Sequence, residues 1–430
     1  MSGFSFHNHG WWCDAIAIHD LAVRYGTPLY VYSRDRIAEN FKRLADAFKP
    51  LNAHIHYSVK ANANGSILRL LRDLGSGFDV VSGGELFRVL RIGADPATIV
   101  FAGVGKTEHE LAYALDNHVG WINVESSQEL ELLDRLAAAR SPGDAMSLAI
   151  ALRINPAVDA DTHHHIATGG YRSKFGIDLD EARFILQNTK RYPNLDIAGL
   201  HLHIGSQLAS PDATIDAVQH VLELTHRHPI RMLDVGGGFP VAYQPGDHFP
   251  DPSIFAEALA RLLSSPMRST PEAKWSGAVP HPLLQVAIEP GRSIIADAGA
   301  LIAEVHYVKL RAGRRIIVTD ASMTELIRPA LYEAYHHIVA VNGGEPANTL
   351  ADVVGPVCES ADQLGIDRAL PEVQRGDQLL ILTTGAYGSS MASNYNSRPR
   401  PAEVMVEGLT HRLIRKREAW EDLIVLEVDK

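Results

Sequence analysis

A lysine at the end of an apolar run is the first feature of this sequence that suggests chemistry. Lys60 ends the run HYSVK, and charged residues are rare in buried segments unless they are paired or functional. A lysine that is removed from water has a lowered pKa and forms Schiff bases readily. A structural ion pair with Asp79 or Glu125 is the competing interpretation.

Two later runs suggest an anion pocket beside a carboxylate. Gly236, Gly237 and Gly238 can bring backbone N–H groups close to a phosphate, although a tight turn would also need small residues. Arg292, in the run EPGR, adds a positive charge and a fork of donors. Pyridoxal 5'-phosphate (PLP) requires an amine, a phosphate site and a carboxylate such as Glu289 for its pyridine nitrogen. The sequence therefore predicts PLP as the cofactor.

These residues follow short apolar runs that are predicted to be buried strands of a parallel sheet. Stretches with apolar residues at helical spacing lie between them. Eight such units predict the fold class: an α/β protein with a (β/α)8 TIM barrel, whose active site lies at the C-terminal ends of the strands. A doubly wound sheet would need a glycine-rich turn after its first strand, where this chain has Lys-Ala-Asn. The predicted strands are 53–61, 77–82, 99–103, 121–126, 148–155, 197–205, 231–238 and 283–291, and the predicted helices are 66–74, 84–92, 108–117, 127–139, 178–189, 211–225 and 252–263.

The pattern of apolar runs and turn residues in the sequence changes after about residue 295. Short runs rich in Val and Ile and broken by Gly, Asn and Pro predict a mostly antiparallel β domain of barrel or sandwich type. The run TPLYVYS (27–33) predicts a strand that precedes the barrel. We expect a PLP-binding barrel at 34–294 and a β domain built from both chain ends, 1–33 and 295–430.

Composition excludes several classes of partner. The net charge is −11 and no run is rich in Lys and Arg, so no nucleic acid partner is expected. The two cysteines provide no disulfide framework, and no segment predicts a signal peptide or a membrane helix, so we expect a cytoplasmic protein. Consecutive histidines at 163–165 point in different directions on a loop, and no metal site is expected.

An ordered set of motifs resembles one family along nearly the whole chain. The set is similar to the fold type III PLP-dependent decarboxylases, which have an alanine racemase-like barrel, and most of all to the diaminopimelate decarboxylases. The motifs are YSVKAN (57–62), FDVVSGGEL (78–86), SKFGI (173–177), GLHLHIGSQ (199–207), DVGGGF (234–239), EPGR (289–292), IRPALY (327–332), GPVCES (355–360), GAYG (385–388) and NYNSRPRPAE (394–403).

The resemblance implies roles for individual residues and an activity, the decarboxylation of meso-2,6-diaminopimelate to L-lysine and CO2. Lys60 would bind PLP covalently, His203 would stack on its ring, and Cys358 would donate a proton. It also implies a homodimer in which the second subunit contributes Cys358 and Glu359 to a shared site. The implied cofactor-binding residues are Lys60, Asp79, His203, Ser206, Gly236, Gly237, Gly238, Glu289, Gly291, Arg292 and Tyr387. The implied substrate-binding residues are Arg292, Arg328, Tyr332, Glu359 and Tyr387.

Other activities are open at this point. One is a decarboxylase for another D-amino acid, such as D-ornithine or D-lysine, or for a polyamine precursor. Arg328 favours diaminopimelate, because it offers a partner to a distal carboxylate that those substrates lack. A PLP racemase of similar layout is disfavoured by the GPVCES and SRPRPAE runs. A catalytically inactive binding protein should have lost the lysine or the phosphate glycines, both of which are present.

Overall fold

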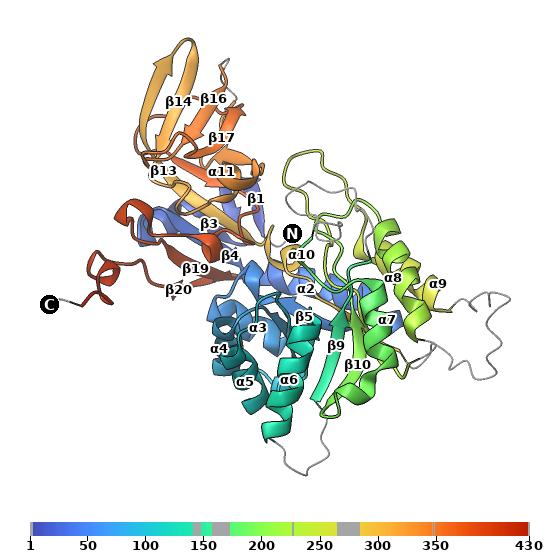
Figure 1. The fold of residues 1–430 in the computed structure, drawn as a ribbon. Helices are drawn as coiled ribbons and strands as arrows, with labels where there is room; N and C mark the ends of the chain where they lie inside the picture. Colours follow the sequence, from blue (N-terminus) through green and yellow to red (C-terminus); the bar gives the residue numbers. More distant parts are fainter. Residues whose placement is uncertain are drawn as a thin grey trace.

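The larger part of the chain folds into a domain built around a closed barrel of eight parallel strands (Figure 1). The structure is a computed structural model that describes residues 3–140, 148–156, 173–225, 228–264, 284–345, 347 and 349–428. Each strand is short and apolar, since it is buried by side chains on both faces. The barrel strands are β5 (His54–Ser58), β6 (Gly77–Val80), β7 (Ile99–Phe101), β8 (Trp121–Val124), β9 (Leu148–Arg153), β10 (Leu195–His201), β11 (Met232–Asp234) and β12 (Gln285–Ile288). The predicted TIM barrel is confirmed.

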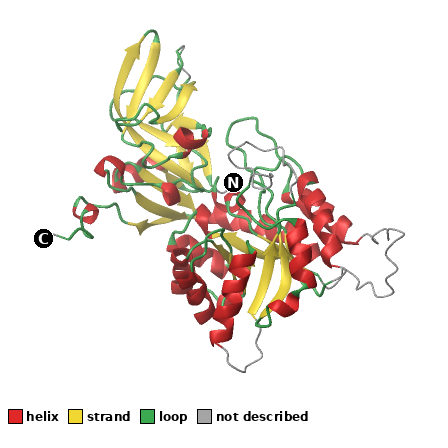
Figure 2. Ribbon diagram, in the orientation of Figure 1, coloured by secondary structure: helices red, strands yellow, loops and turns green. Residues whose placement is uncertain are grey.

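Helices surround the barrel (Figure 2). Most of them begin at a residue whose side chain caps the helix. The side chain of Ser82 accepts a hydrogen bond from the backbone of Glu85, and Thr107 forms a capping box with Glu110. The helix α2, which the periodicity analysis does not name, packs across α9. The helices are α2 (Arg34–Phe48), α3 (Gly65–Asp73), α4 (Gly83–Arg91), α5 (Glu108–Asp116), α6 (Ser127–Arg140), α7 (Leu179–Gln187), α8 (Asp212–Thr225) and α9 (Pro252–Ser264).

The second sheet is built from both ends of the chain. The strand β4 (Leu29–Ser33) lies between β13 and β19, antiparallel to β13 and parallel to β19. All five of its residues are buried. The predicted β domain is thus present as a mostly antiparallel sheet, and its N-terminal strand is central. Its other strands are β13 (Gly299–Arg311), β14 (Arg314–Thr319), β15 (Ile338–Ala340), β16 (Ala351–Val354), β17 (Gln363–Arg368), β18 (Gln378–Ile381), β19 (Ala402–Glu407) and β20 (Thr410–Arg415).

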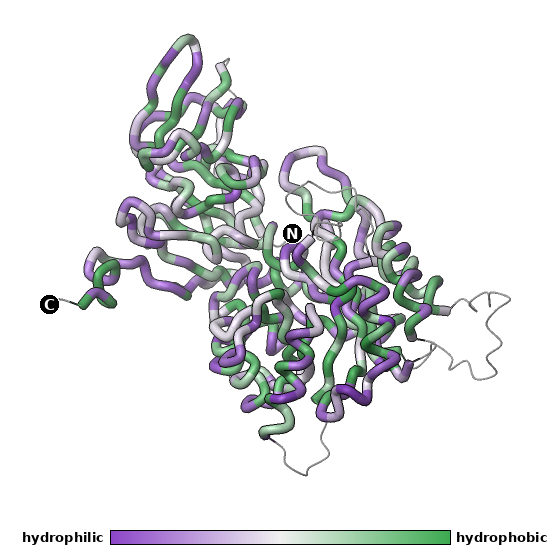
Figure 3. Tube along the Cα trace, viewed as in Figure 1, coloured by the Kyte–Doolittle hydropathy of each residue, from purple (hydrophilic) through white to green (hydrophobic). Residues whose placement is uncertain are grey.

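Smaller elements complete the structure. A three-stranded sheet is followed by the helix α1 (Ile18–Tyr25) and packs against the β domain. Hydrophobic stretches run along the barrel strands (Figure 3). The buried apolar residues of the helices belong to the same core cluster as those of the strands. None of the helices in the described ranges is both long and apolar enough to span a membrane. The remaining elements are β1 (Phe4–His7), β2 (Gly10–Cys13), β3 (Ile16–Ala17), α10 (Arg292–Ile295) and α11 (Arg328–Tyr332).

Candidate active site

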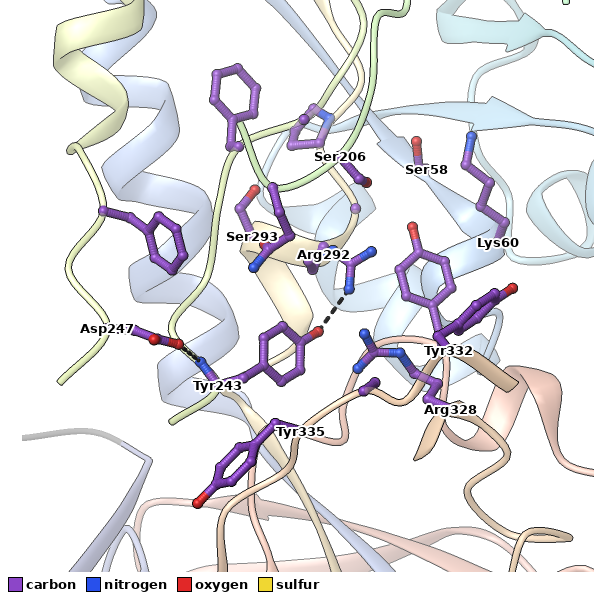
Figure 4. A pocket seen from close by; sticks show the side chains of 18 of the residues that line it. Ser58, Lys60, Ser206, Tyr243, Asp247, Arg292, Ser293, Arg328, Tyr332 and Tyr335 are labelled. Carbon is purple, nitrogen blue, oxygen red and sulfur yellow. Dashed lines mark hydrogen bonds between the residues drawn. The ribbon is translucent and has the colours of Figure 1, made fainter. Parts of the chain in front are cut away.

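A cavity of about 630 Å³ opens at the C-terminal ends of the barrel strands, against the β domain. Figure 4 shows its wall, where Lys60 and Ser58 face two arginines and several tyrosines. Residues that the sequence analysis selected from segments far apart in the chain therefore meet at one place. The predicted residues that line the cavity are Lys60, His203, Ser206, Gly238, Glu289, Gly291, Arg292, Arg328, Tyr332 and Tyr387.

Lys60 lies in a short 3-10 turn (Val59–Ala61) directly after β5. Its Nζ is 3.2 Å from Oδ2 of Asp79, a fully buried carboxylate that also accepts a hydrogen bond from Ser58 at 2.7 Å. Burial by itself lowers the pKa of Lys60, but the attraction of Asp79, Tyr387 and Glu289 outweighs it and raises the pKa. The predicted lowering of the pKa at Lys60 is wrong for the chain alone. Asp79 orients the amine and keeps it charged.

Glu289 lies at the end of β12 and is held by two neighbours. His201 places Nε2 3.1 Å from Oε2, and Asn123 donates to Oε1 at 3.3 Å. Burial by itself raises the pKa of Glu289, but His201 and Lys60 outweigh it and hold the pKa below its ordinary value. Glu289 is therefore an ionised, oriented carboxylate 5% exposed in the cavity wall.

The glycine run makes a close-packed turn after β11. A Cβ atom at Gly236, where φ is +71°, would lie 2.5 Å from the carbonyl oxygen of Leu202. At Gly237 the Cβ atom would lie 2.5 Å from the carbonyl oxygen of Glu289. Gly238 lines the cavity and has a φ of +98°. Only glycine fits here, and the bare backbone leaves room for an anion beside Arg292.

His203 and Ser206 belong to the loop that follows β10. His203 is half-buried, and its Nδ1 accepts a hydrogen bond from the backbone N–H of Gly237 at 3.3 Å. Burial and the positive charge of Lys60 lower the pKa of His203 to about 3, so its ring is neutral. A neutral ring beside Lys60 suits stacking on an aromatic ligand.

Two arginines and a tyrosine form the opposite wall. Arg292 donates a hydrogen bond to the hydroxyl of Tyr243 at 2.9 Å, and its guanidinium lies 4.9 Å from the ring centre of Tyr387. The guanidinium of Arg328 lies 4.7 Å from the ring centre of Tyr243. Nε of Arg292 is buried and has no hydrogen-bond partner among the described residues. This wall offers two cations to anionic groups of a ligand.

Tyr387 has a strained backbone at this wall. Its φ is +58°, a value that bulky residues rarely adopt. Its N–H donates a hydrogen bond to the carbonyl oxygen of Ala61 at 2.9 Å. Ala61, which follows Lys60 in the chain, therefore helps to hold the ring of Tyr387 at the cavity.

Cys358 and Glu359 lie away from the cavity of their own chain. Both are exposed, and Cys358 contacts Asn396 at 3.5 Å. Glu359 accepts a hydrogen bond from the hydroxyl of Tyr395 at 2.5 Å and lines a separate surface pocket. Within one subunit these two residues do not join the other predicted site residues. The histidines at 163–165 lie outside the described residues.

Sequence reasoning gave no role to four side chains of the site. His201 belongs to the motif GLHLHIGSQ and lies beside Glu289, as does Asn123, whereas Tyr243 lies between the arginines. His336 contacts Arg328 from behind the cavity wall. Strand periodicity could have drawn attention to Asn123, because it stands on a barrel strand as other site residues do. Tyr243 and His336 lie on loops, whose course only the folded structure reveals.

The residues of the cavity fit PLP. They supply an amine at Lys60, an ionised carboxylate at Glu289 and a neutral ring at His203. The glycine turn and the unpartnered Nε of Arg292 supply donors for a phosphate. This set matches the three requirements of the cofactor: an aldehyde partner, a partner for its pyridine nitrogen and a phosphate site.

Comparison with known proteins agrees with the geometry. Residues 34–296 match the family model described as the pyridoxal binding domain of pyridoxal-dependent decarboxylases. The chain is thus a PLP-dependent decarboxylase by fold and site. It is 42% identical over 421 residues to the diaminopimelate decarboxylase of Aquifex aeolicus (strain VF5), covering 97% of this chain and 95% of the relative. The chain belongs to the diaminopimelate decarboxylase family.

Two solved structures of that family superpose closely on this fold. Diaminopimelate decarboxylase of M. jannaschii in complex with L-lysine is 34% identical, with a TM-score of 0.90, over 100% of this chain and 98% of that chain. The Helicobacter pylori enzyme (I148L mutant) with L-lysine is 39% identical, with a TM-score of 0.86, over 95% and 98%.

Proposed function

We propose that the protein decarboxylates meso-2,6-diaminopimelate to L-lysine and CO2 with PLP as its cofactor. The main support is that one cavity is lined by the amine of Lys60, the carboxylate of Glu289 and two arginines. Relatives that share this layout over nearly their whole length are named diaminopimelate decarboxylases, and two solved ones hold L-lysine.

The cofactor-facing residues have separate tasks. Lys60 would bind the cofactor aldehyde, and Asp79 orients the amine. His203 would stack on the cofactor. Ser206, the glycine turn and Arg292 would hold the phosphate. When bound, PLP accepts the electron pair that the departing carboxylate leaves on the α-carbon.

Glu289 would keep a proton on the pyridine nitrogen of the bound cofactor, and this would be its contribution to the reaction. The positions of His201 and Asn123 hold the carboxylate ionised and fixed in direction. A carboxylate arranged before the reaction stabilises developing charge without reorganising. After CO2 leaves, a proton has to be added to the α-carbon of the substrate. We assign the delivery of this proton to Cys358 or Lys60.

Substrate recognition requires charges of both signs. Arg328 and Tyr332 approach the cavity from α11, and Tyr387 approaches it from the loop that follows β18. Arg328 binds the distal carboxylate of the substrate, and Arg292 and Tyr387 assist. Glu359 binds the distal ammonium.

The exposed position of Cys358 and Glu359 supports a homodimer with a shared site. In our proposal each subunit inserts this segment into the cavity of the other. With Cys358 and Glu359 supplied by the partner, an isolated subunit lacks two residues of its proposed site. The cytoplasm is the proposed location.

Borohydride reduction tests the cofactor assignment. We expect the purified enzyme to lose its visible absorbance on reduction and to carry a pyridoxyl group on the peptide that contains Lys60. The K60A variant should carry no label. A label on another lysine in the wild-type enzyme would contradict the proposal.

Substrate trials test the activity against its main alternative, a decarboxylase for D-lysine, D-ornithine or a polyamine precursor. CO2 release from meso-diaminopimelate with formation of L-lysine is expected. Release from D-lysine but not from meso-diaminopimelate would assign the enzyme to the alternative. Arg328 at the cavity wall favours the first outcome, because the alternative substrates lack a distal carboxylate.

A further inference from the structure

His336 is a fully buried residue behind the cavity wall and has no part in the roles given above. Its Nε2 lies 3.0 Å from Nη1 of Arg328, and its Nδ1 lies 3.1 Å from the carbonyl oxygen of Leu382. The cavity is lined by Arg328 but not by His336. The histidine therefore touches the arginine from the side away from the ligand space.

The partners of His336 determine its tautomer. A guanidinium can only donate, so Nε2 of His336 has to accept. A carbonyl oxygen can only accept, so Nδ1 has to carry the proton and donate. Burial and the nearby charge of Arg328 lower the pKa of His336 to about 3, and the ring stays neutral at the pH at which the enzyme works. Nε2 of His336 is therefore available as an acceptor for Arg328.

The aromatic ring of Tyr243 packs against one face of the Arg328 guanidinium. Cζ of Arg328 lies 4.7 Å from the ring centre of Tyr243, and the Tyr243 ring meets the His336 ring edge-on at 5.3 Å. Tyr243 is tied in turn to Arg292 by its hydroxyl group. Contact at one nitrogen and on one face removes the rotational freedom of a long side chain, which otherwise costs entropy on binding.

We propose that His336 is a positioning residue that aims Arg328 at the distal carboxylate of the substrate and thereby sets the selectivity for substrates that carry one. The inference rests on the proposed function, in which Arg328 binds that carboxylate. Its physical basis is preorganisation: a guanidinium held in one orientation presents two parallel N–H donors to a carboxylate.

Two small amines isolate the distal carboxylate. Loss of CO2 from one centre of meso-diaminopimelate leaves L-lysine, which keeps the distal carboxylate, whereas cadaverine lacks both carboxylates. Both can be measured as inhibitors of CO2 release. We expect H336N to raise the inhibition constant of L-lysine by about tenfold and to leave that of cadaverine unchanged. KM for meso-diaminopimelate should rise, while kcat stays within about twofold of the wild-type value.

The side-chain geometry of two variants separates positioning from mere packing. Asn at position 336 can still donate to Leu382 but does not reach Arg328. Gln places an amide oxygen where Nε2 was, so H336Q should restore most of the L-lysine affinity. Equal losses for L-lysine and cadaverine, or an H336Q variant no better than H336N, would show that His336 only fills space.

A double-mutant cycle keeps the inference distinct from the proposed function. R328Q alone should weaken L-lysine and spare cadaverine, and H336N should have no further effect in that background. If R328Q fails to discriminate, the assignment of Arg328 is at fault and the inference falls with it. If R328Q discriminates but H336N adds its full effect on top, only the inference is wrong.

The R328K variant tests the same contact should H336N not fold. R328K keeps the positive charge but lacks the planar fork of paired N–H donors that His336 would orient towards a carboxylate. We expect it to lose the preference for L-lysine over cadaverine. Retention of the full preference would mean that charge alone, without orientation, is sufficient.

Discussion

Glu289 illustrates how single residues acquire chemistry from their contacts. A buried carboxylate is ordinarily pushed towards its neutral form. Here His201 at 3.1 Å and the nearby Lys60 hold it ionised. Asn123 fixes its second oxygen. The residue type was readable from the sequence, but the reason for its charge was not.

Replacing the Glu289 carboxylate tests this view. We expect E289Q to fold and bind PLP but to lose at least about 100-fold in kcat, because an amide cannot hold a proton on the pyridine nitrogen. The measurement is CO2 release together with the visible spectrum of the bound cofactor. An E289Q enzyme with near wild-type kcat would contradict the role of the carboxylate.

The buried residue His56 makes the stability of the fold depend on pH. Burial lowers the pKa of His56 to about 4, and its Nδ1 donates to the carbonyl oxygen of Thr98 at 3.0 Å. The unfolded chain binds a proton near pH 6.5 and the folded chain does not, so stability falls as the pH drops through that window.

The His56→Asn variant lacks this titration. Between pH 7 and pH 5 the wild type should lose stability of the order of 2 kcal/mol more than the variant does. Denaturant melts at the two pH values measure the difference. Parallel losses in both proteins would mean that His56 is charged in the folded state.

At the scale of elements, the turn after β11 carries the strongest steric demand. Gly237 has no room for a Cβ atom, which would lie 2.5 Å from the carbonyl oxygen of Glu289. A substitution there moves the end of β12 as well as the turn. The proposed phosphate site and the Glu289 carboxylate are therefore coupled through the backbone.

A pair of glycine variants tests that coupling. G237A should weaken PLP binding by at least about tenfold, because the turn has to move to relieve the clash between the added methyl group and the carbonyl oxygen of Glu289. G105A is the matched control, because a Cβ atom there meets nothing within 4 Å. Titration of the apoprotein with PLP gives both dissociation constants. Equal affinities in the two variants would remove the turn from the site.

The sequence predicted the elements well where periodicity is clear. All eight barrel strands overlap their predicted runs, because both-face burial leaves an apolar signature. The helix α2 was not named, although Ser33 caps it. The partners of β4 were also beyond prediction, since pairing between distant strands leaves no local signal. Residue types at the cavity were predicted, whereas Tyr243 and His336 depended on the path of loops.

At the scale of the whole molecule, the separation of Cys358 from Lys60 has a functional meaning. In the proposed dimer with shared sites, a subunit that keeps Lys60 but lacks Cys358 would be complemented by a subunit that keeps Cys358 but lacks Lys60. Mixing K60A with C358A should recover about a quarter of the wild-type activity, because half of the dimers are mixed and each has one intact site.

The control for this experiment is each variant alone after the same dissociation and reassociation. Both should be far less active than the mixture. If the mixture is no more active than the mean of its components, each site uses its own Cys358 and the shared-site proposal is wrong.

The central place of β4 has a consequence for how the protein is made. Leu29–Ser33 leaves the ribosome before any barrel strand, but its neighbours β13 and β19 follow only at Gly299–Arg311 and Ala402–Glu407. The barrel can close during synthesis, since its strands are consecutive in the chain. The strand β4 has to wait without a partner on either edge until β13 has been made, and without one on its second edge until β19 follows. Nascent chains of this protein are therefore expected to expose that strand to chaperones for most of their synthesis.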